Sequence, residues 1–434
     1  MTAGARQMSS LTLAAAGDSL ITMRVAQSRA SGFQRLVDLI RGHDVAFTNL
    51  EVSLHEFRGA PQAASKGIYA IGHPRLIEDL KAMGFNLFSI ANNHMMDWGE
   101  GGLFATMETL DRAGVVYAGA GHHLEAARSP RYLETPAGRV ALIAVTSTMP
   151  PHAPAGEQRS DCQGRPGVNP LRYSETFTVD PAAFEHIVRA NRELGLDRRR
   201  EFLMKLGVEH PDPAGVATAF ERKFRAGDEP RVETEPHPGD LAGNLKWVRD
   251  ARRQADWVLV SVHAHELLST VGYDVPADFI PAFCRAAVDA GADLIIGHGP
   301  HRLRGVEIYR GRPILYSLGN FIYQPETIRL HPADYYAALR VAPGGTPADT
   351  VEARGQLDPV LWESAVATCR FGEGGVDNLR LHPVTLGFGL PRTQRGTPVL
   401  AEPADGRAIV ERIAALSPTA RVEWQREGFG SVRW

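Results

Sequence analysis

Several short apolar segments of the sequence each stop at a side chain that can bind a metal ion. They are residues 11–18, 44–51, 86–94, 257–263 and 294–298. Short apolar runs bounded by glycine, proline or polar residues are typical of buried strands. Patterns with helical spacing lie between them, for example at residues 32–41 and 279–290, and this alternation predicts an α/β fold. In such folds ligands bind outside the carboxyl ends of the strands.

The last of these segments carries two histidines close together. Its apolar run stops at Gly297, and Gly299 and Pro300 separate His298 from His301. Glycine followed by proline breaks a helix, so the two imidazoles are not a pair on one helical face. Taken alone, the segment fits either a buried strand that feeds a ligand-bearing loop or a surface turn that happens to hold two histidines.

The set of strand ends favours the ligand loop. The ends supply two carboxylates, an amide and several imidazoles, whereas random polar residues would include lysine, serine and threonine as often. Carboxylate and imidazole without thiolate suit Mn, Zn or Fe better than Ca or a cysteine-bound zinc. We therefore expect one or two divalent ions, and a carboxylate such as Glu51 would bridge a pair.

Composition limits the other classes of function. A chain of 434 residues predicts one large domain with insertions or two domains. The net charge of −3 gives no reason to expect a nucleic acid or an anionic membrane as partner. Three distant cysteines fit a reducing compartment. No signal peptide or stretch of transmembrane length is evident, so we expect a soluble cytoplasmic protein without a membrane anchor. The oligomeric state is not indicated.

Residues 149–243 differ in amino-acid composition from the rest of the chain. Proline, glycine, arginine and acidic residues dominate there. We interpret this stretch as an insertion that contains helices at residues 181–194 and 214–225. Regular patterns resume with a helix at residues 245–255 and continue to a hairpin at residues 305–318.

Six motifs in order resemble the CapA family, which is associated with poly-γ-glutamate capsule synthesis and belongs to the calcineurin-like metallophosphoesterase superfamily. The resemblance covers about residues 11–147 and 240–325. The motifs are Gly17-Asp18, Asn49-Leu-Glu51, Ala91-Asn-Asn-His94 with Asp97, Val260-Ser-Val-His263, Gly297-His-Gly-Pro-His301 and Tyr316-Ser-Leu-Gly-Asn-Phe321.

This resemblance implies a fold and a site. The expected fold is a four-layer α/β/β/α sandwich over residues 11–325, interrupted by the insertion at about 149–243 as a lid. Residues 326–434 are expected to form strands and a helix that pack on this domain. The implied metal ligands are Asp18, Glu51, Asn93, His263, His298 and His301. His94 is the implied acid or charge-stabilising group, and Asp97 could orient it.

The sequence departs from the superfamily pattern at two positions. Ser19 and Leu20 follow Asp18, so the histidine of the Asp-x-His pair is missing, and Glu51 stands where the superfamily has aspartate. His265 or Glu266 could complete the site, or His265 is a loop residue that contacts substrate or solvent.

Other polar residues near the motifs leave two interpretations open. Arg302 and Arg304 could hold a substrate carboxylate or phosphate, or they are solvated. Asn320 could support the metal-binding loops. The remaining histidines that we considered are interpreted as surface or loop residues. They are His43, His55, His122, His123 and His152.

Two functions follow from this reading. The first is a metal-dependent hydrolase that uses metal-activated water on a phosphoester or a γ-glutamyl or other amide bond of a small molecule or peptide. The second is a non-hydrolytic accessory of poly-γ-glutamate synthesis or export that binds polymer or metal. The missing histidine after Asp18 favours the second, and the lack of an evident membrane anchor favours the first.

Overall fold

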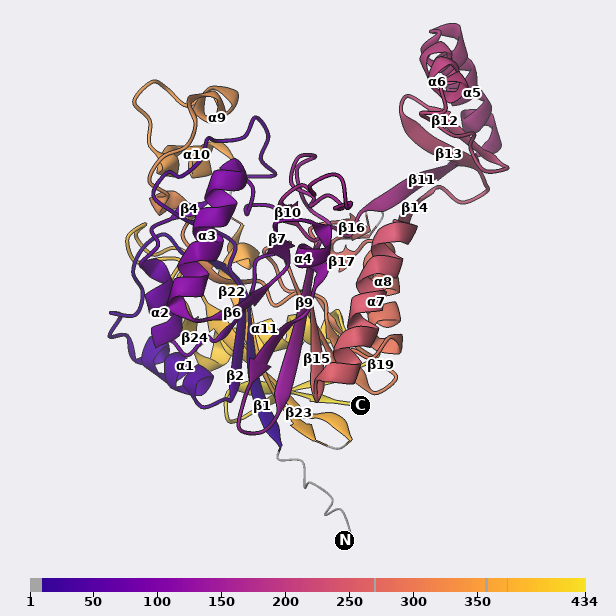
Figure 1. The fold of residues 1–434 in the computed structure, drawn as a ribbon. Helices are drawn as coiled ribbons and strands as arrows, with labels where there is room; N and C mark the ends of the chain where they lie inside the picture. The colour runs from indigo at the N-terminus through magenta and orange to yellow at the C-terminus, as the bar shows by residue number, and fades with distance from the viewer. Residues whose placement is uncertain (1–9, 269–270, 356–357, 373) are drawn as a thin grey trace.

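The computed structural model describes residues 10–268, 271–355, 358–372 and 374–434. Residues 1–9, where we found no signal peptide, lie outside the described residues. The described chain is a mixed α/β structure, which confirms the predicted class (Figure 1). Among these residues no helix combines the length and the apolar character needed to cross a lipid bilayer.

The first large sheet contains the amino-terminal strand β1 near its centre. β1 pairs in parallel with β2 on one side, and with the carboxy-terminal strand β22 in antiparallel on the other. β21 also pairs with β1, and β24 pairs with β23. Its strands, in spatial order, are β25 (Arg421–Gln425), β26 (Phe429–Arg433), β23 (Gly375–Thr385), β22 (Glu363–Gly372), β1 (Leu11–Leu20), β2 (Val45–Asn49), β5 (Leu87–Ser89) and β6 (Val116–Ala118), with β21 (Asn320–Tyr323) and β24 (Val399–Leu400) beside this path.

The second large sheet contains β15 and β18, the two strands that end in His263 and His298. β9, β15, β18 and β20 run in parallel, so their carboxyl ends meet at one edge. The predicted hairpin is formed by β19 and β20, which turn at Arg310 and Gly311. The order is β19 (Val306–Tyr309), β20 (Arg312–Leu315), β18 (Leu294–His298), β15 (Trp257–His263), β9 (Arg139–Thr146) and β8 (Arg131–Glu134).

The alternation of side chains along β1 explains why it is apolar throughout. Leu11 and Leu13 belong to one hydrophobic cluster, whereas Ala14 and Ala16 belong to another. Successive side chains of a strand point to opposite faces, so both faces of this sheet are buried. The first cluster also contains Leu259 and other residues of the second sheet, so the two sheets share one core.

Helices cover the other faces of both sheets. The outer face of the first sheet packs against α1 (Ser31–Arg41), α2 (Leu76–Ala82) and α3 (Gly99–Ala113). The outer face of the second packs against α7 (Pro238–Gln254) and α8 (Phe279–Asp289). The carboxy-terminal helix α11 (Pro403–Ala415) packs on β23, β25 and β26 and buries Ile409 and Ile413 in the core between the sheets.

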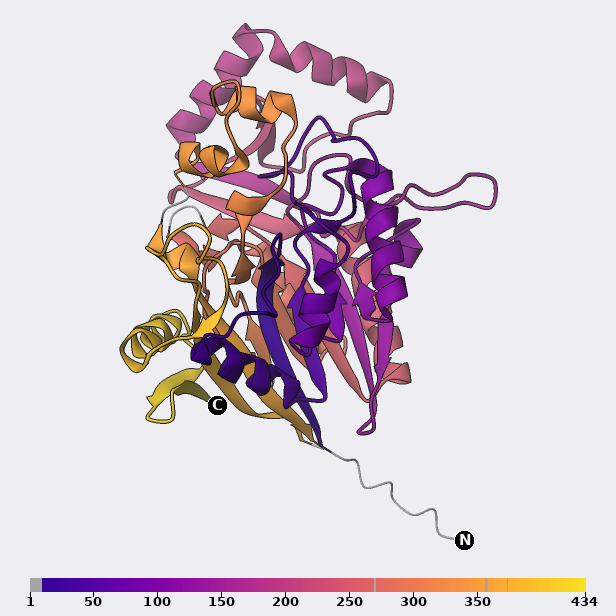
Figure 2. The ribbon, with the colours of Figure 1, turned by 90° about the vertical axis from the view of Figure 1, so that its left-hand side faces the viewer.

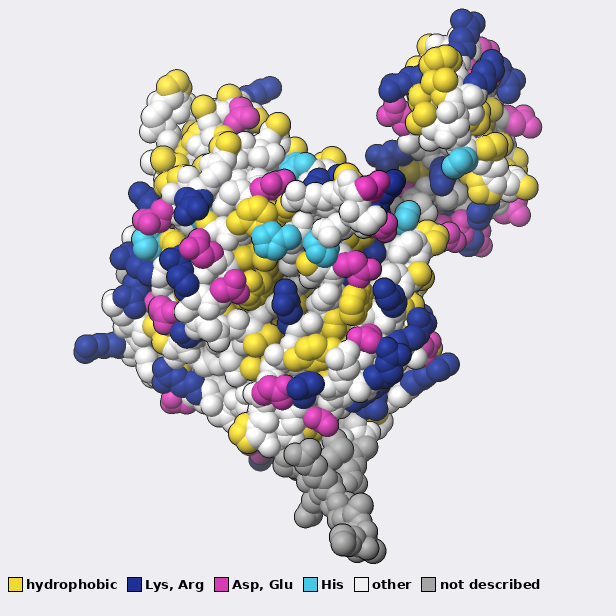
Figure 3. All heavy atoms as spheres, viewed as in Figure 1, with side chains coloured by type: hydrophobic (Ala, Val, Ile, Leu, Met, Phe, Trp, Pro, Cys, Tyr) yellow, Lys and Arg dark blue, Asp and Glu magenta, His cyan; other side chains and the backbone are white. Residues whose placement is uncertain are grey.

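Residues 173–236 form a projecting unit, which we call the arm. It contains a four-stranded sheet and the helices α5 (Pro181–Glu193) and α6 (Leu196–Lys205), and it stands out from the body (Figures 1 and 3). Its strands, in spatial order, are β12 (Val216–Ala219), β13 (Arg222–Ala226), β11 (Tyr173–Val179) and β14 (Arg231–Pro236). The predicted helix at residues 181–194 is confirmed. The predicted helix at residues 214–225 is wrong, because β12 and β13 form an antiparallel hairpin there.

A second unit, residues 328–355, we call the cap. It contains α9 (Ala333–Ala338) and α10 (Pro347–Ala353), and α10 packs on the short helix η1 (Pro325–Thr327) that follows β21. The cap and the arm lie at the same end of the molecule, away from the N-terminus (Figures 1 and 2). Figure 3 shows the surface hollowed between them.

The remaining elements are short. α4 (Leu124–Arg128) packs beside β7, and η2 (Pro359–Trp362) precedes β22. The short strand pairs are β3 (Ser53–Leu54) with β4 (Ile71–Gly72), β7 (Ala120–Gly121) with β10 (Gly167–Val168), and β16 (Leu267–Leu268) with β17 (Gly272–Pro276).

Candidate metal centre

The carboxyl ends of the two sheets bring the candidate ligands together. Asp18 lies in β1, His263 is the last residue of β15, and His298 is the last residue of β18. β15 and β18 are parallel with His263 opposite His298, which fixes the two imidazoles side by side. The predicted ends therefore converge although they are up to 280 residues apart in sequence.

A first group that could hold a metal ion consists of Asp18, His263 and His298. One donor atom from each lies within 4.8 Å of the others, and all three side chains are fully buried. Oδ1 of Asp18 is 3.3 Å from Nδ1 of His298 and 3.6 Å from Nδ1 of His263. The two Nδ1 atoms are 3.0 Å apart.

The electrostatics of this group favour the forms that bind metals. Burial alone would raise the pKa of Asp18, but hydrogen bonds and charge from His263 and His298 hold it well below its usual range. Burial lowers the pKa of His263 to about 4. An ionised carboxylate beside a neutral imidazole is the protonation state that divalent metals require.

A second group consists of Glu51, His265 and His301, whose donor atoms also lie within 4.8 Å of one another. Glu51 is fully buried, and neither carboxylate oxygen has a hydrogen-bond partner among the described residues. Burial, together with the charges of Asp18 and Asp97, raises the pKa of Glu51 well above its usual value. A buried carboxylate without partners is costly unless a cation compensates it, so the donor set fits a bound metal.

His265 is one of the two residues that we considered as completing the site, and it belongs to the second group. Its Nε2 lies 3.0 Å from Nε2 of His263, and its ring packs against that of His301. Glu266 instead accepts hydrogen bonds from the hydroxyls of Ser147 and Thr148, at 2.6 and 3.0 Å. Of the two residues considered, the structure brings His265 and not Glu266 into the group.

Asn93, His94 and Asp97 form a chain beside the second group. Asp97 accepts a hydrogen bond from Nδ1 of His94 at 2.7 Å, which leaves Nε2 as the acceptor for the Asn93 amide at 3.0 Å. The amide oxygen of Asn93 then faces Nε2 of His263 at 2.8 Å. This order directs the oxygen of Asn93 toward the donor groups and Nε2 of His94 toward Oε1 of Glu51, 3.9 Å away.

The loop after β18 holds His301 in an unusual backbone conformation. Its φ is 59°, in the left-handed region that non-glycine residues seldom adopt. Nδ1 of His301 lies 2.9 Å from Oδ1 of Asn320 and 3.7 Å from Oε2 of Glu51. Asn320 therefore supports the loop, as the sequence predicted, and the strained backbone aims the imidazole at the second group.

Two supporting residues were not predicted to have a role. Ser261 lies two positions before His263, and its hydroxyl is 2.7 Å from Nε2 of His298. Asn49, at the end of β2, donates a hydrogen bond to Oδ1 of Asp18 at 2.8 Å. Residues two positions apart in a strand point to the same face, so the position of Ser261 relative to His263 was the available signal for its role.

Both arginines after the histidine loop have protein partners. Arg302 pairs with Asp274 and Asp358, each at 3.0 Å. Arg304 is buried, not solvated, and donates to the carbonyl oxygens of His265 and Glu266 at 3.2 and 2.9 Å. Arg304 thus holds the loop that carries His265. His55 lies in a loop, as expected, and its side chain is buried.

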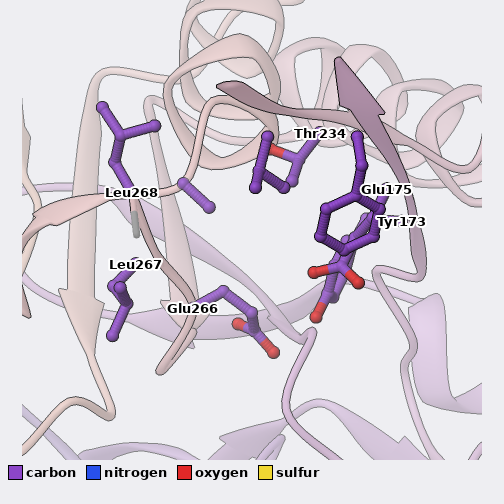
Figure 4. A pocket seen from close by; sticks show the side chains of 9 residues that line it. Tyr173, Glu175, Thr234, Glu266, Leu267 and Leu268 are labelled. Atoms are coloured by element: carbon purple, nitrogen blue, oxygen red, sulfur yellow. The ribbon is translucent and has the colours of Figure 1, made fainter. Parts of the chain in front are cut away.

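A pocket of about 310 Å³ opens at the base of the arm, next to the loop of His265. Figure 4 shows Glu266 and Leu267 on one side of it and Tyr173, Glu175 and Thr234 on the other. The arm is anchored here, because Tyr173 stacks on Phe279 of α8 with ring centroids 4.3 Å apart. Residues of the arm therefore line the same pocket as Glu266, which directly follows the candidate ligand His265 in the sequence.

Comparison with known proteins gives the family. Residues 12–325 match the family model described as bacterial capsule synthesis protein PGA_cap. A Sinorhizobium fredii protein named only as uncharacterized protein y4sH is 36% identical over 94% of this chain and 89% of its own length. The capsule biosynthesis protein CapA of Bacillus anthracis is 25% identical over 73% of this chain and 61% of its own length. The "Probable polyglutamine synthesis accessory protein" of Mycobacterium tuberculosis is 29% identical over 66% of this chain and 58% of its own length. With its matched domain covering well over half of the sequence, the chain belongs to the PGA_cap, or CapA, family.

Proposed function

We propose that this protein is a metal-dependent hydrolase of a phosphoester or of a γ-glutamyl or other amide bond in a small molecule or peptide. The observation that carries the proposal is the pair of adjacent donor groups, one of which contains the buried carboxylate of Glu51, which has no hydrogen-bond partner among the described residues. A structural role alone does not account for this carboxylate, because an apolar residue would fill the same space at lower cost.

The residues that would hold divalent ions are those of the two groups, with the amide oxygen of Asn93 between them. The donor set contains carboxylate and imidazole without thiolate, which fits Mn, Zn or Fe. Ions bound there would supply Lewis-acid polarisation of the scissile group and activation of a water nucleophile.

His94 would act on the leaving group or on developing charge. Asp97 fixes its tautomer through the 2.7 Å bond to Nδ1, so Nε2 is the atom that faces the centre. An imidazole held in this way can hold or deliver a proton at Nε2. Exclusion of water is supported by burial, since Asp18, Glu51 and His263 have no exposed surface.

The fold supports the same proposal. Two sheets with a shared core and helices against their outer faces fit the four-layer α/β/β/α arrangement of the metallophosphoesterases. Within this proposal residues 11–325 are the catalytic domain, and the insertion at 149–243 is a specificity lid. Residues 326–434 form strands and a helix that pack on the catalytic domain. The pocket at the base of the arm supports a role of the insertion near the substrate.

The names of two relatives favour a second candidate. They refer to capsule biosynthesis and to an accessory of polyglutamine synthesis, so the site could bind polymer or metal without turnover. Both candidates share the metal centre and differ in whether a bond is cleaved.

Metal analysis combined with a substrate panel separates them. Purified protein is loaded with Mn or Zn, its metal content is measured, and phosphoesters and γ-glutamyl peptides are tested for cleavage. We expect bound metal and a metal-dependent activity that Asp18→Ala and His298→Ala abolish. His186→Ala, an exposed residue of the arm, is the control and should leave both unchanged. Bound metal without cleavage of any substrate would leave the accessory role, and protein that binds no metal and shows no metal-dependent cleavage would refute the hydrolase.

A further inference from the structure

The cap ends in a cation close to the candidate metal centre. Arg354 directly follows α10, and its side chain is exposed. α10 packs on η1, which follows the strand that begins with Asn320, the partner of His301. The position of Arg354 is therefore tied to the element that supports the second donor group.

Arg354 is not engaged by an acidic residue. Its hydrogen bond goes to the hydroxyl of Tyr335 at 3.3 Å, and no carboxylate of the described residues lies within ion-pair distance of it. Two other arginines near α10 and η1 are paired with carboxylates: Arg392 contacts Glu352, and Arg395 contacts Glu326. Arg354 thus keeps most of its five donors available.

Gly67 separates Arg354 from His94. A Cβ atom on Gly67 would lie 3.4 Å from Cε1 of His94 and 3.9 Å from Nη1 of Arg354. The imidazole and the guanidinium therefore border the same small space, which the absence of a side chain at Gly67 leaves open. His94 is also the residue beside Glu51, so this space adjoins the second donor group.

His331 of the cap adds an unpartnered polar side chain to this region. It is 7% exposed, and neither of its ring nitrogens has a hydrogen-bond partner among the described residues. Burial, then the charges of Arg354 and of His94, lower its pKa to about 4. The His331 ring also packs on Tyr335, with ring centroids 4.8 Å apart, and the Tyr335 hydroxyl is the group that accepts the hydrogen bond from Arg354, so Tyr335 links the two side chains.

We propose that Arg354, together with His331, forms an oxyanion subsite beside His94 and the metal centre, and that the substrate carries a second anionic group there. Guanidinium groups bind carboxylate and phosphate through charge-assisted, often bidentate hydrogen bonds. The inference rests on the proposed function, because it concerns the substrate of the same site. It narrows the substrate class to compounds with a carboxylate or phosphate close to the bond that is cleaved.

Calorimetric titration of metal-loaded protein tests this subsite without requiring turnover. The probes are glutarate, inorganic phosphate and, as an uncharged match for glutarate, glutaramide. We expect Arg354→Gln to weaken binding of at least one anionic probe tenfold or more, with unchanged metal content and unchanged Tm. Loss for glutarate assigns a carboxylate group, and loss for phosphate assigns a phosphate group. Arg354→Lys should keep part of the affinity, since lysine retains the positive charge but lacks the planar guanidinium that forms bidentate hydrogen bonds.

Arg340→Gln is the matched control. Arg340 is exposed in the same cap and carries the same charge. Equal affinities of Arg354→Gln and the unmodified protein for every probe would overturn the inference, and so would an equal loss in Arg340→Gln, which would indicate general surface charge. Arg354-dependent anion binding without any cleavage would keep the subsite and refute the hydrolase. Cleavage that is insensitive to Arg354 would do the reverse.

Discussion

Glu51 is the buried carboxylate of the second donor group, and its protonation links the stability of the metal-free protein to pH. In the metal-free protein its carboxylate is buried and unpartnered, and its raised pKa means that folding favours the protonated form. A group whose pKa is raised in the folded state stabilises the protein at low pH, and this contribution is lost as pH rises through the folded pKa. The metal-free protein should therefore lose stability as pH rises above the ordinary range of a glutamate.

Glu51→Gln tests this linkage. Glutamine keeps the shape and removes the charge, so the metal-free variant should be as stable as the unmodified protein at pH 5 and more stable at pH 8. The metal-loaded variant should show a smaller rise in Tm on addition of Mn or Zn, because one ligand is lost. Thermal denaturation at both pH values, with chelator or with metal, measures both effects. A variant that is less stable at pH 8 without metal would contradict this account of Glu51.

Asp97 acts through His94. It accepts the hydrogen bond from Nδ1 of His94 and also accepts from the backbone amide of Ala70 and the hydroxyl of Ser65. Asp97→Asn should keep the packing but permit the wrong imidazole tautomer. Under the proposed function we expect kcat to fall about 10- to 100-fold, the range found for residues that orient functional groups, with unchanged metal content. Ser65→Ala, which removes a neighbouring bond, serves as the comparison. A loss of metal instead of kcat would assign Asp97 to metal binding.

At the scale of elements, the close approach of β1 and the segment before β21 requires glycine at position 17. A Cβ atom there would overlap the carbonyl oxygen of Gly319, which also accepts the hydrogen bond from the amide of Asp18. Gly17→Ala should therefore destabilise the protein by about 1–3 kcal/mol or more, as overpacked cores do, and should displace Asp18. Gly372→Ala, where a methyl group meets nothing within 4 Å, is the control. Chemical denaturation compares the two, and equal midpoints would contradict the argument.

The strands that carry the site could be predicted because their pattern is local. An apolar run that stops at Asp18 or His298 is visible in a few residues. The structure places His298 at the end of β18 and Asp18 two residues before the end of β1. The hairpin at residues 216–226 could not be predicted in this way. Its turn has Phe220 and Glu221 at φ values of 49° and 60°, and this conformation normally selects asparagine or glycine. Neither asparagine nor glycine stands at these two positions, so a turn could not be recognised there, and the apolar spacing resembled that of a helix.

In the candidate site, too, some residues could be predicted from local patterns and others could not. Asp18, Glu51, Asn93 and the histidines were predicted from strand ends and from the family resemblance. That His265 and not Glu266 joins the site depends on the backbone after β15, and on Arg304 holding this loop by its carbonyl oxygens. Ser261 received no prediction, because a serine inside an apolar strand has no specific meaning until its neighbour in space is known.

At the scale of the whole molecule, the centre depends on contacts between distant parts of the chain. β22 pairs with β1 across about 350 residues of sequence, and the first and second sheets share one core. No local pattern specifies such pairings, which explains why the α/β class was predictable but the place of the carboxy-terminal strands was not. The four-layer metallophosphoesterase arrangement and the domain boundaries remain predictions.

The arm offers the clearest test of how the molecule is divided. It joins the body through β11 and β14, whose base is fixed by Tyr173 on Phe279 and by the hydrogen bond from the amide of Phe279 to Thr234 at 3.0 Å. The distal part, residues 180–230, packs mainly on itself and leaves Phe202 60% exposed. A body whose cores do not include this part should fold without it.

We therefore expect that replacing residues 180–230 by a short glycine-serine turn leaves the two donor groups intact. The shortened protein should bind as much metal as the full chain and unfold within a few degrees of it, because the three cores of the body contain no residue of the deleted part. If the insertion is a specificity lid, KM for peptide substrates should rise whereas KM for a small phosphoester should not. Metal analysis, thermal denaturation and steady-state kinetics give the three readouts. Loss of metal or of folding would show that the arm is part of the body's core structure, and unchanged KM values for both substrates would remove the lid from the proposal.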